Sequence, residues 1–253
     1  MDLAFWVYPL LFLTGFAAGL VDAMAGGGGI IALPVLLNLG LPVGVALGTN
    51  KFQASFGSFI AAWHYTRRGL VDLRDCRVGI VATLLGALAG AFVVRQIDSR
   101  ILGTIIPWLL AAIVLYTIFR PEVGEEDRSP RMGVKGFSIA FGLVLGFYDG
   151  FFGPGAGSFW TIAYVLVLGY NFSKATAYTK VMNCTSNLAA LAMFLIAGKV
   201  HFLAGLAMAA GQMSGARLGA GLVVKRGARF VRPLFLTMAS LTLLRLLWLH
   251  FGR

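Results

Sequence analysis

Long apolar runs, separated by short polar stretches, occupy most of this chain. The runs cover residues 3–22, 29–39, 44–66, 78–95, 101–119, 137–151, 157–169, 174–198, 202–223 and 232–250. Several of them reach or approach the ~20 residues that an α-helix needs to cross the hydrocarbon core of a bilayer. The pattern therefore predicts an all-α, polytopic membrane protein.

Glycine-rich breaks interrupt two of the apolar stretches. Four consecutive glycines, Gly26 to Gly29, follow the first run, and a similar break spans Gly150–Gly157. A helix through such a segment costs about 1 kcal/mol per glycine relative to alanine. We therefore expect the first helix to end here and a new one to begin after Gly29. The free N–H groups at a helix start carry a partial positive charge, which favours anions.

The second arm after each break contains only 11 to 13 residues. At about 1.5 Å per residue, such an arm is too short to span a bilayer. Residues 3–39 and 137–169 are therefore predicted to form re-entrant-type hairpins, each entering and leaving from one side. Non-helical backbone at membrane depth must be buried in protein or line a cavity, so we expect the tips of both hairpins to lie inside the protein.

The two halves of the chain resemble one another on either side of the polar stretch 120–136. A shift of 127 residues places Gly15, Gly19, Asp22, Gly26 and Gly28 on Gly142, Gly146, Asp149, Gly153 and Gly155. A shift of 129 residues places Gly40, Ala46, Lys51, Gly69, Val71, Gly86 and Gly90 on Gly169, Ala175, Lys180, Gly198, Val200, Gly215 and Gly219. Residues 1–119 and 137–253 are therefore predicted to be repeats, each a hairpin followed by three helices, as in many transporters.

Loop charges predict that the repeats are inverted. The loop 67–77 carries four arginines, whereas its counterpart in the second half carries only Lys199. The bias is reversed in the next loops, where Arg95 and Arg100 correspond to the four basic residues of 225–232. The positive-inside rule then places 67–77, 120–135 and 225–232 in the cytoplasm and both termini outside. The two hairpin tips would enter from opposite faces and meet near the midplane.

Composition narrows the function classes further. The chain is 58% hydrophobic and 12% charged, and a soluble domain carries about twice that charged fraction. The net charge of +11 is concentrated between the apolar runs, which favours membrane anchoring over nucleic-acid binding. The first residues lack a basic segment, so no removable signal peptide is expected. Cys76 and Cys184 differ in setting and lie far apart in sequence, so neither a disulfide nor a metal site is expected, and no cofactor either.

Enzymatic activity is not expected. The sequence Gly155-Ala156-Gly157-Ser158 is the only suggestion of a serine nucleophile, and Gly26–Gly29 the only suggestion of a nucleotide loop. Neither has the required context, because no His–Asp partnership is expected beside Ser158 and no parallel sheet is predicted.

Two lysines within apolar runs are the strongest candidates for chemistry. Lys51 and Lys180 occupy equivalent positions, and a lysine this deep in an apolar helix usually faces a cavity or a partner. Together with neighbouring amides and the two helix starts, they predict a site for a small oxyanion. The predicted substrate-binding residues are Lys51, Lys180, Asn50, Gln53, Asn183, Asn187, Gly28, Gly29, Gly155 and Gly157. In the alternative interpretation, each lysine extends to the membrane interface or pairs with Asp149 or Asp22.

Asp22 and Asp149 precede the two breaks and are candidates for proton coupling. A carboxylic acid buried at membrane depth can carry a proton. The competing interpretation is a helix cap or a fixed counter-charge to lysine.

Four motifs stand out around the breaks and the lysines: Gly19-x-x-Asp22-x-x-Ala25-Gly26-Gly27-Gly28-Gly29, Ala46-Leu47-Gly48-Thr49-Asn50-Lys51, Gly146-Phe147-Tyr148-Asp149-Gly150 and Ala175-Thr176-Ala177-Tyr178-Thr179-Lys180. With these motifs the sequence resembles the TauE/SafE family of sulfite and organosulfonate transporters, in a bacterial inner-membrane branch. The resemblance covers nearly the whole chain.

That resemblance implies transport of small sulfur-containing or carboxylated anions, driven by an ion gradient. The expected partners are a small anionic substrate, a coupling ion (H⁺, with Na⁺ as the alternative) and membrane lipid, with no nucleic acid. A homo-oligomer is left open. The leading hypothesis is a secondary transporter, and the alternative is a passive anion channel that uses the same site.

Overall fold

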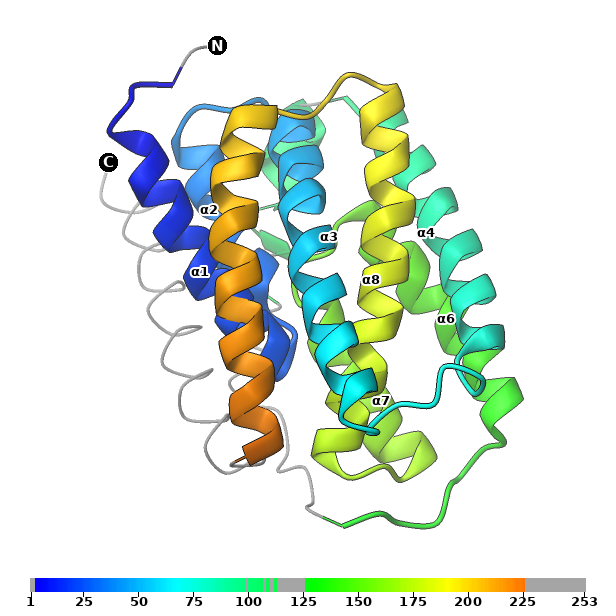
Figure 1. Cartoon of the computed structure of the whole chain (residues 1–253). Coiled ribbons are helices and arrows are strands. Elements are labelled where there is room, and N and C mark those ends of the chain that lie inside the picture. Colours follow the sequence, from blue (N-terminus) through cyan, green and yellow to red (C-terminus); the bar gives the residue numbers. More distant parts are fainter. Residues whose placement is uncertain (1–2, 99, 107, 110–111, 113–125, 226–253) are drawn as a thin grey trace.

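The computed structural model describes residues 3–98, 100–106, 108–109, 112 and 126–225 (Figure 1). The regular secondary structure of these residues is entirely helical. The labelled helices are α1 Val7–Ala25, α2 Gly28–Asn38, α3 Val43–Arg67, α4 Arg77–Gln96, α6 Val134–Phe151, α7 Ala156–Leu168 and α8 Phe172–Ile196. A further helix occupies 202–225. Most of the predicted run 101–119, and all of 232–250, lie outside the described residues.

Helix lengths and composition agree with a membrane protein. The helices α1, α4 and α6 are both long enough and apolar enough to cross a bilayer. The helices α3 and α8 have 25 residues each, or about 37 Å at 1.5 Å per residue, but they carry buried polar side chains. The apolar helices α2 and α7 have 11 and 13 residues, so they are the short second arms of the two predicted hairpins.

The breaks between the hairpin arms depend on left-handed backbone that glycine supplies. α1 ends at Ala25 and is capped by Gly26, whose φ is 78° and whose N–H donates to the Asp22 carbonyl. In the second hairpin, Gly153 and Gly155 have φ values of 97° and 81°. A residue with a side chain adopts such values only with strain.

Both second arms begin earlier than the sequence predicts. α2 starts at Gly28 rather than after Gly29, and α7 starts at Ala156 rather than Gly157. The prediction treated every glycine in the first break as helix-breaking. Only Gly26 in that break needs a left-handed conformation, so the helix resumes two residues later and takes Gly28 and Gly29 into its first turn.

Small residues bring helices of the two halves of the chain into backbone contact. A Cβ atom added to Gly15 or Gly19 of α1 would overlap the backbone of Met208 or Gln212 in the 202–225 helix. A Cβ added to Gly86 or Gly90 of α4 would likewise overlap the backbone of α6. Close approach at small residues is typical of helix packing in membranes. The central helices α3 and α8 run antiparallel between these two pairs (Figure 1).

The connections gather at two ends of the bundle (Figure 1). One, the Arg74 end, contains 68–76, 126–133 and the turn between α7 and α8. The other, the Asn38 end, contains residues 3–6, 39–42 and 197–201. The α1–α2 hairpin therefore starts and finishes at the Asn38 end, and the α6–α7 hairpin at the Arg74 end.

The segment after residue 125 is held against the turn between α7 and α8. Asp127 accepts hydrogen bonds from the backbone N–H of Asn171 at 2.6 Å and from its side-chain amide at 2.9 Å. The backbone hydrogen bond, with help from nearby Lys174, holds the pKa of Asp127 below its usual value.

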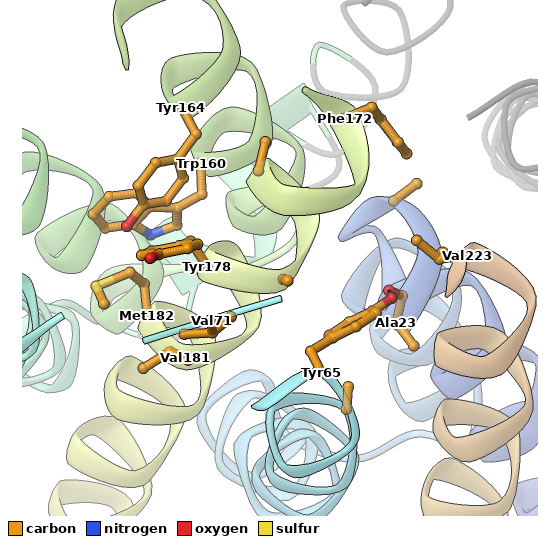
Figure 2. Close-up of a cluster of buried hydrophobic side chains, with 14 of the residues drawn as sticks. Ala23, Tyr65, Val71, Trp160, Tyr164, Phe172, Tyr178, Val181, Met182 and Val223 are labelled. Atoms are coloured by element: carbon orange, nitrogen blue, oxygen red, sulfur yellow. Dashed lines mark hydrogen bonds between the residues drawn. The ribbon is translucent and has the colours of Figure 1, made fainter. Parts of the chain in front are cut away.

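An aromatic cluster packs α7, α8 and the 68–76 turn together toward the Arg74 end (Figure 2). The ring centroid of Tyr164 lies 5.6 Å from that of Trp160 and 5.8 Å from that of Tyr178. Tyr65 of α3 points toward Ala23, and its hydroxyl donates to the Ala23 carbonyl at 2.8 Å. That bond satisfies a carbonyl near the C-terminal end of α1 and fixes the first break against α3.

Candidate functional site

The two glycine-rich breaks are in direct contact. Ser158, in the first turn of α7, donates its backbone N–H to the Gly26 carbonyl at 3.2 Å and its hydroxyl to the Ala25 carbonyl at 2.8 Å. A Cβ atom on Gly157 would lie 2.5 Å from the Gly26 Cα, so both positions must lack a side chain. The serine in the Gly-Ala-Gly-Ser motif therefore satisfies carbonyl groups at the end of α1.

The first buried ion pair joins α3 to α6. Lys51 Nζ lies 2.6 Å from Asp149 Oδ1, and only 2% and 4% of the two side chains are exposed. The same ammonium donates to Asn187 Oδ1 at 3.2 Å, and the Ser186 hydroxyl donates to Asp149 Oδ2. The buried charges thus have hydrogen-bond partners from α8 as well as each other, which burial of an ion pair requires.

Gly153 makes room for this pair. A Cβ atom at this position would lie 2.6 Å from Lys51 Nζ and 3.1 Å from Asp149 Oδ1. The left-handed backbone of the second break and the space for the lysine head group therefore depend on the same residue.

The second ion pair joins α8 to α1. Lys180 Nζ lies 3.1 Å from Asp22 Oδ2, with the lysine side chain fully buried and the aspartate side chain 14% exposed. The other carboxylate oxygen of Asp22 accepts from the Gly28 N–H at 3.4 Å. The positive start of α2 therefore faces a carboxylate of the protein itself, in the place where the sequence predicts an external anion.

The contacts of the two lysines are those of the counter-charge interpretation. Lys51 and Lys180 are 1% and 0% exposed, so neither extends to the membrane interface. Each is paired with an aspartate of the other half of the chain, which is the counter-charge alternative. The site therefore does not present two unpaired cations, because a carboxylate lies against each ammonium.

The candidate amides lie on α3 and α8 around the breaks. Asn50, Gln53, Asn183 and Asn187 are all buried, and Gln53 Nε2 donates to Asn50 Oδ1 at 3.0 Å. Asn50 approaches Gly29 and Asn183 approaches Gly157, each near the start of a broken helix. Gly28 is in the first turn of α2, and Gly155 caps α7. The structure thus brings the predicted residues together around the touching breaks.

Two of these amides have unsatisfied acceptors. Gln53 Oε1 and Asn183 Oδ1 are buried and have no hydrogen-bond partner in the described part of the chain. A buried polar atom without a partner costs about 1–3 kcal/mol. The placement of O and N in an amide side chain follows from its neighbours, so rotation of either amide would turn a donor toward the same space.

Sequence reasoning missed Ser186, Gly153 and Tyr148. Tyr148 precedes Asp149, and its hydroxyl donates to the Pro154 carbonyl at 2.6 Å, which closes the second break. Ser186 carried a usable signal, since it is a polar residue beside Asn187 in an apolar run. Ser55 and Ser58, which follow Lys51 in α3, donate their hydroxyls to carbonyls of α3 itself.

The described residues do not meet the requirements of a metal site. They include no group of three or more His, Cys, Asp or Glu side chains that would hold a metal ion. The arrangement instead offers two ammonium groups, two carboxylates and several amides at the junction of four helices and two helix breaks.

Broken helices that meet beside buried charged residues inside an apolar bundle are characteristic of membrane transporters. The family model described as "Sulfite exporter TauE/SafE" matches residues 11–246. The chain therefore belongs to the TauE/SafE family.

Curated relatives carry the same class in their names. A "Probable membrane transporter protein" of Haemophilus influenzae is 42% identical over 255 residues, covering 99% of this chain and 100% of that protein. "Probable membrane transporter protein YfcA" of Escherichia coli K12 is 40% identical, covering 98% and 94%. "Probable membrane transporter protein ORF9" of a Sinorhizobium species is 39% identical, covering 97% and 94%. No solved structure matches the chain.

Proposed function

We propose that this protein is a secondary transporter that moves a small anion across the bacterial inner membrane and couples that movement to protons. The substrate class is sulfite, an organosulfonate or a related small organic oxyanion. The observation that carries the proposal is the pair of buried Lys–Asp contacts at equivalent positions beside the two helix breaks.

The contacts between the halves support two inverted repeats, 1–119 and 137–253, joined by the linker 120–136. Lys51 of the first half pairs with Asp149 of the second, and Lys180 of the second pairs with Asp22 of the first. Exchanging the halves exchanges the two pairs, as a two-fold relationship requires. Because α1 and α6 start from opposite ends of the bundle (Figure 1), the corresponding axis would lie in the membrane plane.

Packing between helices has the same reciprocity. Gly86 and Gly90 of α4 contact the backbone of α6, and Gly215 and Gly219, their counterparts in the second half, contact the backbone of α1. Each repeat therefore packs one helix against the long arm of the other repeat's hairpin.

Charge balance explains how protons and an anion would be coupled. Each Lys–Asp pair is neutral, so an anion that binds to the lysine must displace the carboxylate. A displaced, charged carboxylate in the protein interior would be left uncompensated at a cost of several kcal/mol. Protonation of the aspartate removes that charge and frees the lysine for the anion. The site then stays neutral with either occupant, and the anion and the proton favour each other's binding.

The remaining candidate residues would hold the anion beside the freed lysine. Asn50, Gln53, Asn183 and Asn187 provide amide donors, and the first turns that contain Gly28, Gly29 and Gly157, with the cap at Gly155, provide backbone N–H groups. Two pairs of this kind would accept one dianion with two protons. The same charge balance excludes binding of a dianion while both aspartates remain charged and paired with their lysines.

Basic residues support the predicted orientation. The Arg74 end carries Arg67, Arg68, Arg74 and Arg77, and also the positive charges of 128–135 and Lys174. The Asn38 end has fewer, among them Lys199. By the positive-inside rule the Arg74 end is cytoplasmic, and the N-terminus is periplasmic.

Transport by the purified protein in proteoliposomes tests the proposal. With sulfite as the probe and an imposed pH gradient, we expect sulfite to accumulate above its external concentration. Asp149→Asn should abolish this pH-driven accumulation but retain sulfite exchange, whereas Asp98→Asn, the same change at an exposed position, should behave like wild type. A passive anion channel would only dissipate a sulfite gradient, and that result would overturn the transporter proposal.

A further inference from the structure

An apolar groove of about 430 Å³ lies on the outer surface between α4 and α6. Val81 and Leu85 of α4 and Ile139 and Leu143 of α6 line it, and all four side chains are exposed. Arg77, Val78 and Ala82 complete the lining. The groove is thus apolar along its length and contains a cation at the position where α4 begins.

The two walls of the groove start at the same end of the molecule. A Cβ atom on Gly79 would approach Ser138, and one on Gly142 would contact Ala82, so α4 and α6 run side by side in parallel. Figure 1 shows both helices rising from the Arg74 end. Lys135 is the second residue of α6 and is exposed, so a second cation is placed at the end where Arg77 lies.

The helix starts add to this positive end. Neither first turn contains an acidic residue, and neither helix has a side-chain cap. The free N–H groups at the starts of two parallel helices therefore carry partial positive charge. Two carboxylates precede α4 in the 68–76 turn, where Asp72 accepts a hydrogen bond from the Arg74 N–H and Asp75 accepts one from the Tyr178 hydroxyl.

We propose that this groove binds one anionic phospholipid. An acyl chain lies between α4 and α6, in contact with Val81, Leu85, Ile139 and Leu143. The phosphate lies beside Arg77 and Lys135, at the two helix starts. Basic pockets between membrane helices on the cytoplasmic side are suited to anionic lipid head groups, and a phosphate at a helix N-terminus gains from the dipole.

A second copy of the chain fits this face less well. Two copies with the same orientation in one membrane are related by an axis along the membrane normal, so residues at equal depth face each other. Packing groove against groove would bring Arg77 and Lys135 of one copy toward the same residues of the other. Like charges in contact oppose that arrangement, whereas a phosphate complements them.

Native mass spectrometry of the purified full-length protein tests the proposal. Bound phosphatidylglycerol is counted against phosphatidylcholine with the same acyl chains, and we expect preferential retention of the anionic lipid. The double variant Arg77→Gln/Lys135→Gln should bind phosphatidylglycerol about 25-fold more weakly, at roughly fivefold per basic residue. The matched variant Arg74→Gln/Arg131→Gln removes two exposed cations of the same end outside the groove lining, and it should retain wild-type binding.

Each remaining arm of the experiment has a decisive outcome. Equal losses in the two double variants would show a general surface-charge effect and overturn the site. Glycerol phosphate in excess should fail to displace the lipid, because the groove holds the acyl chain; full displacement would contradict the proposal. Ile139→Trp fills the groove and should reduce lipid binding without changing the protein's oligomeric mass. A dimeric wild type that becomes monomeric in Ile139→Trp would show that a second copy occupies the groove instead.

Discussion

Removing the charges of the Lys51–Asp149 pair one at a time and together should separate the cost of burial from anion binding. Lys51→Met leaves the Asp149 carboxylate buried and unpaired, and Asp149→Asn leaves the Lys51 ammonium in the same condition. Both side chains are at most 4% exposed, so water compensates neither. Breaking a buried pair from one side costs about 3–5 kcal/mol.

The double variant Lys51→Met/Asp149→Asn restores neutrality. The amide that replaces the Asp149 carboxylate can still accept the Ser186 hydroxyl hydrogen bond, so the loss should be smaller than in either single variant. The three variants form a double-mutant cycle, and residues in direct contact typically couple by about 0.5–3 kcal/mol. Heating the detergent-solubilised protein and measuring the fraction that stays monodisperse ranks the stabilities of the variants.

Sulfite should then affect the variants differently. In Asp149→Asn the buried ammonium has no carboxylate partner, so an anion replaces the lost charge, and sulfite should raise the unfolding temperature at every pH. A ligand at 100 times its dissociation constant adds about 2.7 kcal/mol of stability. The double variant has no ammonium at this position, and its unfolding temperature should respond to sulfite less than that of wild type.

The second pair gives an internal comparison. Asp22 is 14% exposed, against 4% for Asp149, so Lys180→Met should be tolerated better than Lys51→Met. The reasoning is refuted if the single changes at Lys51 and Asp149 add without coupling. It is also refuted if the double variant responds to sulfite as strongly as Asp149→Asn.

Two further predictions concern the breaks and the orientation. Gly157→Ala should destabilise the protein by about 1–3 kcal/mol through overpacking and impair sulfite transport, because its Cβ would lie 2.7 Å from Asn183 Nδ2. Gly221→Ala is the control, because a Cβ there meets open space. Equal unfolding temperatures of the two variants would contradict the predicted contact. In a Cys184→Ser background, cysteines at Arg74 and Pro130 should be labelled by a membrane-impermeant maleimide only from the cytoplasm, and one at Asn38 only from the periplasm. Native Cys76 should give little background labelling, because burial, with Asp75 and Asp72 nearby, raises the pKa of its thiol to about 12. Labelling of residues 74 and 130 from the periplasm alone would contradict the predicted orientation.

The helices were predictable from the sequence because apolar length and glycine content act locally. A run of 25 residues such as α3 has enough apolar positions to be recognised despite Lys51. The contact between the breaks follows from the same reasoning, since short second arms force the tips into the protein. The exact starts of α2 and α7 did not follow, because they depend on which glycine adopts a positive φ, and Gly26 and Gly27 look alike in sequence.

The sequence offered Lys–Asp pairing only as an alternative and did not decide which lysine meets which aspartate. Equivalent positions identified Lys51, Lys180, Asp22 and Asp149 as a set, but their spacing along the chain allowed several pairings. Only the three-dimensional arrangement, in which Lys51 of α3 reaches Asp149 of α6 and Lys180 of α8 reaches Asp22 of α1, decides that each lysine meets the aspartate of the other half. The role of Gly153 was missed because it arises from a contact between helices far apart in sequence, whereas Ser186 was missed although its place beside Asn187 was a usable signal.

The difference between the two pairs has a consequence for the proposed transport cycle. If the repeats are inverted, the two pairs are equivalent in sequence, yet here one aspartate is enclosed by Ser186 and the lysine while the other is partly exposed. A protein that alternates access between two sides must exchange these environments, with Asp149 becoming the more exposed partner when the protein opens the other way. The residue equivalent to Ser186 in the first half is Gly57, which has no hydroxyl to donate. The two aspartates therefore cannot exchange environments completely, because the Ser186 hydroxyl that donates to Asp149 has no counterpart beside Asp22. On this reasoning Asp22 gives up its lysine more readily, and the Lys180–Asp22 pair is the one at which proton and anion would first be exchanged.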